Sequence, residues 1–347
     1  MMKNKSIVLL IISCLALLFS FIRKLPDLSI SKKDVELKIP KGFPKPTYDF
    51  SNNKLSPEIF TLGRKLFYDP ILSKDSSTSC QSCHQRVAAF AHIDHNLSHG
   101  IDGKIGTRNV PGLQNMIWIT SYMWDGGVNN LEVQPLNPLT SPLEMDENIA
   151  HIVSKLKNNK AYVALFKKAY KDTMINSERL LKSLAQFTGL MISANSRYDK
   201  YMAGKDTFSA QEKSGLEYFR AKCASCHTEP LFTDNSYRNN GLLADTSLND
   251  IGRGKITNLE ADNYKFKVPS LRNIEMTFPY MHDGRFKKLK DVLSHYSSKN
   301  HNATTDAEAT KIGALSDKER KDIIAFLLTL TDKEFLNDSR FGDPNMK

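Results

Sequence analysis

Apolar side chains recur every three or four positions through most of the chain, which is the spacing of amphipathic helices. The helices predicted from this spacing cover 57–68, 146–171 and 177–202. Ser56-Pro57 marks the first helix start, since proline fits the first turn of a helix. Ser209 and Ser316 each begin a capping box that precedes an apolar periodic run. No strand alternation of useful length occurs, so the predicted fold class is mostly α.

The N-terminal end has a different pattern. Lys3 and Lys5 precede a run from Ile7 to Ile22 that is almost wholly apolar. A basic start before an apolar run is typical of a secretory signal, and this run is shorter than the roughly 20 residues that a membrane-spanning helix needs. We therefore interpret residues 1–24 as a cleaved or lipidated signal peptide, or as a retained N-terminal anchor. In both cases the rest of the chain is exported.

Composition and charge narrow the class of protein further. Of 347 residues, 40% are hydrophobic and 25% charged, which excludes a disordered chain and a polytopic membrane protein. The formal net charge is +10, which suits nucleic acid, an anionic membrane surface or an acidic protein partner. The sequence contains no basic helix interleaved with aromatic residues, so we expect no nucleic-acid binding.

The chain is long enough for two domains of common size. Residues 25–50 contain several lysines and prolines and are interpreted as a tether. We place the domain boundary near 204–208, just before the Ser209 capping box. The expected N-terminal domain covers 51–205. The expected C-terminal domain covers 206–347, and its last residues can pack back on the first domain.

Four of the five cysteines lie in two CysXXCysHis motifs, Cys80 to His84 and Cys223 to His227. Two cysteines at this spacing can form thioether bonds to the vinyl groups of haem, while the following histidine binds the iron. A redox disulfide does not require the histidine, and a zinc site would usually bring its two cysteine pairs closer together in sequence. We therefore predict two covalently bound haem c groups, attached through Cys80, Cys83, Cys223 and Cys226.

The sixth ligand of each iron decides between an electron carrier and a catalyst. Near the first motif, the candidate ligands are His92, His95 and His99. Near the second motif, they are Met276, Met281, His282, His295 and Tyr296. Spacing alone does not choose among them.

Several further blocks, in this order, resemble the bacterial di-haem cytochrome c peroxidase and MauG superfamily over roughly residues 50–330. Besides the two motifs, they are Arg108-Asn109, Met123-Trp124-Asp125-Gly126, Leu131-Glu132-Val133-Gln134, Pro142-Leu143-Glu144-Met145, Phe266-Lys267-Val268-Pro269-Ser270-Leu271-Arg272-Asn273 and Pro279-Tyr280-Met281-His282-Asp283-Gly284. The resemblance implies two cytochrome c-like helical domains, each with one haem, preceded by the signal or anchor segment. It also implies a calcium ion at the domain interface.

The resemblance assigns His84 to the peroxide-reacting haem and His227 to the electron-transfer haem. It places Gln134 and Glu144 in the distal pocket of the first haem, and Trp124 between the haems as an electron bridge. A carboxylate in such a pocket can move a proton between the two peroxide oxygens, and an amide can orient the bound peroxide. Without the resemblance, Glu144 would be interpreted as a carboxylate at a helix start and Trp124 as core packing.

Three further ligand roles follow from the resemblance. Asn109, with the backbone carbonyls of Thr277 and Pro279, would hold the calcium ion. Tyr296 stands where the peroxidases have a methionine ligand, and it corresponds to the tyrosine ligand of the MauG branch, with Met281 as its rival. His99 corresponds to the histidine that caps the resting first haem in enzymes that need reductive activation; an unbound His99 would leave the pocket open.

The resemblance implies a periplasmic oxidoreductase of the cytochrome c peroxidase type. It would reduce H₂O₂ to water with electrons from a small c-type cytochrome or a cupredoxin, and many family members form homodimers. One alternative is a MauG-like enzyme that oxidises residues of a partner protein. Another is a non-catalytic electron-transfer cytochrome, against which the Gln134 and Glu144 pair argues, because an electron carrier needs no distal acid–base group.

Overall fold

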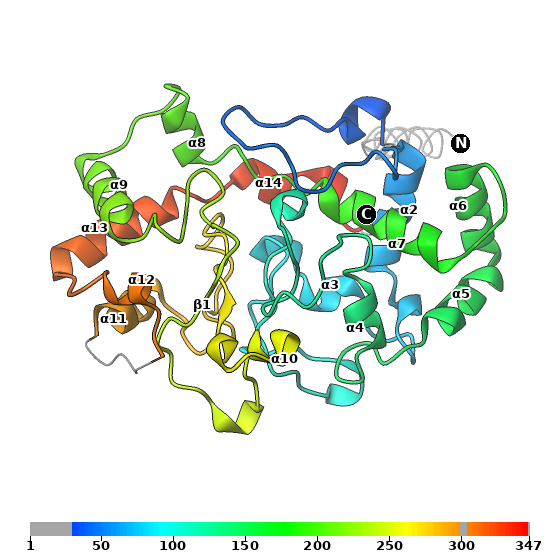
Figure 1. The fold of residues 1–347 in the computed structure, drawn as a ribbon. Coiled ribbons are helices and arrows are strands. Elements are labelled where there is room, and N and C mark those ends of the chain that lie inside the picture. The colour runs from blue at the N-terminus through cyan, green and yellow to red at the C-terminus, as the bar shows by residue number, and fades with distance from the viewer. Residues whose placement is uncertain (1–29, 299–303, 346–347) are drawn as a thin grey trace, which may run out of the picture.

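The structure, a computed structural model, describes residues 30–298 and 304–345 and is mostly helical, as the sequence predicts (Figure 1). Within this part of the chain, the one sheet pairs β1 (Tyr237–Arg238) with β2 (Phe266–Lys267) in antiparallel register. No helix among the described residues is long and apolar enough to cross a membrane. The predicted signal or anchor over 1–24 lies outside the described residues.

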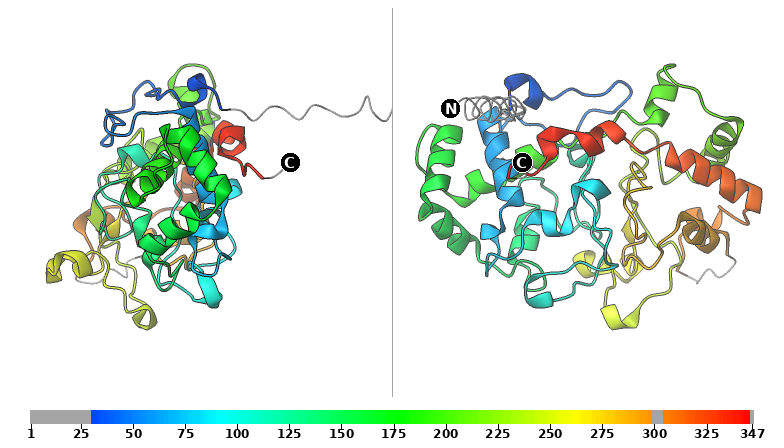
Figure 2. Two further views of the ribbon diagram at one scale, coloured as in Figure 1. Left: turned by 90° about the vertical axis from the view of Figure 1, so that its right-hand side faces the viewer. Right: turned by 180° about the vertical axis from the view of Figure 1, so that it is seen from behind.

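Two groups of helices lie side by side, with loops and β1 between them (Figures 1 and 2). The first group comprises α2 (Pro57–Tyr68), α3 (Cys80–Cys83), α4 (Leu136–Thr140), α5 (Ile149–Lys157), α6 (Lys160–Tyr170) and α7 (Ser177–Gly189). The second comprises α8 (Arg197–Met202), α9 (Ala210–Lys222), α11 (Leu289–Ser297), α12 (Ala307–Thr310) and α13 (Asp317–Leu328), and the short α10 (Gly254–Thr257) lies between the groups. The last helix, α14 (Lys333–Asn337), returns to the first group.

The predicted starts of α2, α9 and α13 are confirmed. The Ser56 hydroxyl accepts hydrogen bonds from the first turn of α2. Ser209 and Ser316 each accept from the backbone N–H of the glutamate three positions on, Glu212 and Glu319, and complete both capping boxes. These signals are local, so they could be recognised from sequence alone.

Two predicted helices are each split in the structure. The stretch 146–171 forms α5 and α6, because the Asn159 side chain accepts from two backbone N–H groups and starts a second helix. The single helix over 177–202 is wrong, since α7 ends at Gly189 and α8 begins after a new capping box at Ser196. Between them, Ser193 pairs with the buried Asn115 side chain through two hydrogen bonds of 2.9 and 3.0 Å. This long-range contact replaces helical bonds and is invisible in the apolar spacing.

Each group of helices has its own hydrophobic core, and both cores are built around one close helix pair. In the first, Gly63 of α2 lies so near α7 that a Cβ would collide with the carbonyl oxygen of Ser183. In the second, Gly215 of α9 lies in the same way against the carbonyl oxygen of Asp322 in α13. The two halves therefore repeat one packing device, in which a glycine lets two helix backbones approach.

Both ends of the described chain pack on the first core. In the segment interpreted as a tether, Val35 and Phe50 are buried, and the Trp118 indole N–H donates to the Pro44 carbonyl at 2.8 Å. From the other end, Phe335 and Phe341 join the same core. The domain boundaries near 204–208 remain a prediction.

A buried ion pair holds the second half together. Arg272 has a fully buried side chain, and its guanidinium donates to both carboxylate oxygens of Asp199 in α8 at 2.8 and 2.9 Å. Its third nitrogen donates to the Pro230 carbonyl at 2.8 Å. Burial alone would raise the pKa of Asp199, but the hydrogen bonds and charge of Arg272 outweigh burial and keep this pKa below its usual value.

We expect Asp199→Asn to lower the free energy of unfolding by about 3 kcal/mol, because the substitution leaves the Arg272 charge buried without its counter-charge. The stabilisation from the ion pair with Arg272 should be complete above about pH 4, the pKa of Asp199 in the unfolded chain. It should be lost as the pH falls through the lower pKa that Asp199 has in the folded protein. Urea unfolding followed by circular dichroism at several pH values measures both effects. Asp172→Asn breaks a more exposed pair with Arg179 and should lower the free energy of unfolding much less. Equal losses in both variants would contradict the assignment.

Candidate active site

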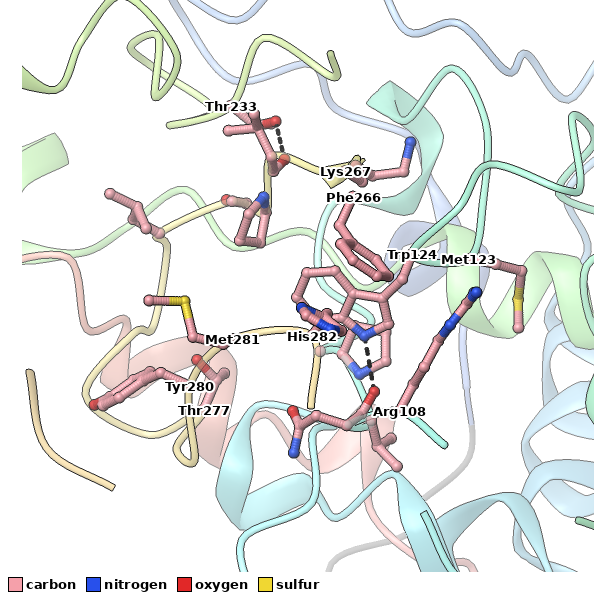
Figure 3. Close-up of a pocket in the computed structure, with 18 of the residues that line it drawn as sticks. Arg108, Met123, Trp124, Thr233, Phe266, Lys267, Thr277, Tyr280, Met281 and His282 are labelled. Carbon is pink, nitrogen blue, oxygen red and sulfur yellow. Dashed lines mark hydrogen bonds between the residues drawn. The ribbon is translucent and has the colours of Figure 1, made fainter. Parts of the chain in front are cut away.

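A cavity of about 850 Å³ lies between the two halves and reaches both CysXXCysHis motifs. Its wall includes Cys83 and His84 from the first motif and Cys223, Cys226 and His227 from the second. Figure 3 shows the middle of this cavity, where Trp124, Phe266 and His282 come together. The two motifs, far apart in sequence, therefore line one continuous space.

Both motifs fold in the same way. The backbone N–H of His84 donates to the Cys80 carbonyl at 2.8 Å, and that of His227 donates to the Cys223 carbonyl at 2.9 Å. In each motif this single helical turn places the histidine immediately beyond the two cysteines. Ser79 caps the first turn with a capping box, and the second turn continues from the end of α9.

The two histidines are held in the orientation that iron ligation requires. Nδ1 of His84 lies 2.7 Å from the Phe90 carbonyl, and Nδ1 of His227 lies 3.1 Å from the Phe232 carbonyl. A carbonyl can only accept, so Nδ1 carries the proton in each ring and Nε2 keeps its lone pair for a metal. Burial lowers both pKa values, that of His84 to about 4, and so favours the neutral ligand form.

The thiols and the cavity also fit haem c. The four cysteines that the structure describes are free thiols rather than disulfides. The Cys83 thiol donates to the His99 carbonyl at 3.3 Å, and burial raises the pKa of Cys80 and of Cys223 to about 12. Neutral, unpaired thiols beside an oriented imidazole on a large apolar cavity match the needs of a thioether-bound haem.

Glu144 and Gln134 line the cavity on the side of the first motif. Burial raises the pKa of the Glu144 carboxyl above its ordinary value. The neighbouring acids have other roles, because Asp146 forms ion pairs with Lys74 and Lys104 at the surface, whereas Glu147 binds Lys155. Of these three acids, Glu144 is the one that lines the cavity.

Trp124 lies between the two halves. Its indole N–H donates to the Asn109 carbonyl at 2.8 Å, and its own carbonyl accepts from the backbone N–H of Lys267 in β2. Beside it, the rings of Phe266 and His282 stack with centroids 3.6 Å apart (Figure 3). The indole is thus fixed by Asn109 in the first half, and the Trp124 backbone is bonded to Lys267 in the second half.

On the side of the second motif, Tyr296 and Met281 both line the cavity. Tyr296 comes from α11, and Met281 from the loop before it. Both contact the side-chain amide of Asn240, at 3.2 Å from the phenol oxygen and 3.5 Å from the sulfur. Sequence reasoning missed Asn240, since it belongs to none of the motifs.

The other predicted ligands are less closely grouped. His99 does not line the cavity; its ring lies 4.1 Å from that of His95, in a cluster that also contains His92. Asn109, Thr277 and Pro279 do line one part of the cavity. There the Asn109 side-chain nitrogen donates to the Asn96 carbonyl at 2.9 Å, so an amide oxygen and two backbone carbonyls are the donors available to a calcium ion.

Arg108 forms ion pairs with both halves of the protein. No function was assigned to it from the sequence. Its guanidinium binds Asp125 in the first half and Asp250 in the second at 2.6 Å each. Burial opposes the charge of Arg108, but the two carboxylates outweigh it and raise the guanidinium pKa. The motif Arg108-Asn109 was recognised, yet its partner Asp250 lies too far along the chain for spacing to indicate it.

Comparisons with known proteins agree with this geometry. A family model described as di-haem cytochrome c peroxidase matches residues 57–207, and a cytochrome c model matches residues 212–331. The methylamine utilization protein MauG of Methylorubrum extorquens is 35% identical, over 80% of this chain and 79% of its own length. The cytochrome c551 peroxidase of Nitrosomonas europaea is 30% identical, over 78% of this chain and 79% of its own length.

Among solved structures, a MauG-like protein associated with microbial copper homeostasis has a TM-score of 0.81 and 31% identity, and the match covers 89% of this chain and 99% of that one. The fold and the two motifs define a two-domain cytochrome c that carries two haem c groups. The chain belongs to the di-haem cytochrome c peroxidase and MauG family, whose members are oxidoreductases.

We expect the mature protein to carry two covalent haems, and the double variant Cys223→Ala/Cys226→Ala to carry one, because a thioether bond requires the thiol. Intact-mass measurement after denaturation counts the attached groups. The reciprocal variant, Cys80→Ala/Cys83→Ala, is the matched control and should lose the other haem. Two covalent haems in either variant would disprove the assignment.

Proposed function

We propose that this protein is a di-haem peroxidase that reduces H₂O₂ to two molecules of water, using two electrons from an external donor and two protons. The observation that carries the proposal is that a half-buried acid and a half-buried amide, Glu144 and Gln134, both line the cavity that also contains the first CysXXCysHis motif. An electron carrier with both irons fully ligated has no use for such a pair. The relatives support the proposal, since several are named cytochrome c peroxidases.

When bound, the first haem supplies the iron on which peroxide is cleaved, and the second supplies a store for one electron. His84 holds its Nε2 toward the first site because its Nδ1–H is fixed on Phe90. The Glu144 carboxylate takes a proton from one peroxide oxygen and returns it to the leaving oxygen. Gln134 donates from its amide and orients the peroxide.

Transfer of electrons between the two sites would pass by Trp124. Its indole lies in the shared cavity wall, and its hydrogen bond to Asn109 fixes the ring plane. On the second side, His227 and Tyr296 would hold the second iron, and His99 would bind the first iron at rest. Binding of His99 would require its ring to leave His95 and turn into the cavity.

The setting of the reaction follows from charge and from the N-terminal sequence. A net charge of +10 favours an acidic electron donor, such as a small c-type cytochrome or a cupredoxin. The export signal expected over 1–24 would place the reaction in the periplasm. A calcium ion held by Asn109, Thr277 and Pro279 would stiffen the interface between the halves; it would supply no redox chemistry.

A second candidate function is oxidation of residues in a partner protein by a MauG-like mechanism. The observation that favours it is Tyr296 on the cavity wall, because an anionic phenolate stabilises oxidised iron better than a thioether does. Similarity to MauG and to the MauG-like structure points the same way. In this case the oxidising equivalents from peroxide would be used on the partner.

Steady-state H₂O₂ consumption by the holoprotein, with a reduced c-type cytochrome as donor, tests these alternatives. Turnover only after reduction by one electron would indicate that His99 caps the resting iron. Turnover from the fully oxidised state would indicate that the first iron has a free binding position for peroxide, as expected for a MauG-like enzyme. Absence of any reaction with peroxide in either state would contradict both enzymatic functions and leave an electron carrier.

We expect Glu144→Gln to slow peroxide consumption by about a hundredfold or more, because it removes the proton acceptor. Burial raises the pKa of Glu144, so the acceptor form accumulates only at higher pH than for an ordinary glutamate, whose pKa is about 4.3. The wild-type rate should therefore rise with pH, and the Glu144→Gln rate should not show this rise. Rate measurements across the pH range give both results.

Asp146→Asn provides the matched control for this experiment. It removes a carboxylate two positions away that binds surface lysines rather than facing the cavity, and asparagine tolerates the positive φ of 47° at this position. We expect near wild-type rates and an unchanged pH profile. A loss in Asp146→Asn as large as that in Glu144→Gln would show that the effect is structural.

A further inference from the structure

Asn240 contacts both candidate sixth ligands of the second haem. Its Nδ2 lies 3.2 Å from the Tyr296 phenol oxygen and 3.5 Å from the Met281 sulfur. All three side chains line the cavity on the side of His227. One amide group is therefore placed between two groups that could each bind the same iron.

Hydrogen bonds fix which end of the Asn240 amide faces the cavity. Its Oδ1 accepts from the backbone N–H of Leu242 at 3.2 Å, so the nitrogen end must face Tyr296 and Met281. The Asn240 backbone is anchored as well, since its carbonyl lies 3.1 Å from Nε2 of His295 in α11. The preceding residue, Asn239, is buried and bonded to Thr304 and Asp306. The donor is thus held by a rigid frame.

The chemistry of the two ligands decides what this donor does. A phenolate oxygen is a strong acceptor for an amide N–H, whereas a thioether sulfur is a weak one. A hydrogen bond to the phenolate draws electron density away from the iron ligand and makes it a weaker donor. A weaker anionic donor stabilises ferric iron less, and the reduction potential rises.

We propose that Asn240 is a positioning residue for the second haem, which orients Tyr296 as the sixth ligand and raises the reduction potential of the phenolate-ligated iron through its hydrogen bond. The inference rests on Tyr296 as a ligand, as in the proposed function, and adds a residue that controls it. The phenolate lowers the reduction potential of the second haem. The hydrogen bond from Asn240 would offset part of this lowering, so that the electron donor can still reduce the haem.

The test is a redox titration of the holoprotein, followed by optical spectroscopy, on the wild type and on Asn240→Leu. Leucine has a similar volume and no donor. In Asn240→Leu, we expect the ferric-to-ferrous ratio of the second haem at a given potential to rise roughly tenfold. For a one-electron couple this corresponds to a midpoint potential about 59 mV lower than in the wild type. The phenolate-to-iron charge-transfer absorption should remain. Asn240→Ala should move the midpoint in the same direction without adding bulk to the cavity.

Two control variants test whether the midpoint shift is specific to Asn240 or results from a general disturbance of the fold. Asn337→Leu makes the same exchange at the end of α14, on an exposed side chain, and should leave both midpoints unchanged. Met281→Leu removes the rival sulfur and should change the second midpoint little. The mass of two covalent haems confirms that each variant has matured.

An unchanged midpoint of the second haem in both Asn240 variants would overturn the inference. Loss of the ligand signature of the second haem in Met281→Leu would also overturn it, because that loss would identify the Met281 sulfur as the ligand. Peroxide turnover by the wild type is measured separately. A shifted midpoint in a protein that consumes no peroxide would support the role of Asn240 and reject the proposed function. Peroxide turnover by the wild type together with an unchanged second midpoint in the Asn240 variants would support the proposed function and reject the role of Asn240.

Discussion

The site depends on one repeated constraint, the closed helical turn of each CysXXCysHis motif. A backbone bond from histidine to the first cysteine sets the position of the ring, and a carbonyl on Nδ1 sets its orientation. Because Phe90 and Phe232 supply those carbonyls, the loop after each motif is part of the ligand geometry. The remaining cavity residues lie around these two imidazoles, so the arrangement of the whole cavity depends on both turns.

Several polar contacts join the halves at the level of this cavity. Arg108 binds one carboxylate from each half, and Trp124 makes hydrogen bonds to both Asn109 and Lys267. Buried, charge-assisted contacts of this kind require defined geometry, whereas apolar contacts tolerate sliding. Directional bonds therefore contribute to the way the two halves face each other across the cavity.

The sequence allowed the helical class, the capped helix starts and the two attachment motifs to be predicted, because each is encoded within a few neighbouring residues. It did not reveal the break between α7 and α8, which depends on Asn115 binding Ser193 across the fold. Nor did it reveal Asn240, whose contacts with Tyr296 and Met281 exist only after folding. The positions of His99 and the calcium donors were inferred from resemblance, and they remain predictions.

The return of the C-terminal segment to the first half has a consequence for the order of folding. Phe335 and Phe341 complete the core beneath α2 and α7, and the Tyr68 hydroxyl donates to the Phe341 carbonyl. The first half to emerge during synthesis therefore cannot close its core until the last residues are available. The core behind the first motif is therefore shared between the two ends of the chain, and it is complete only when the C-terminal segment has packed on it.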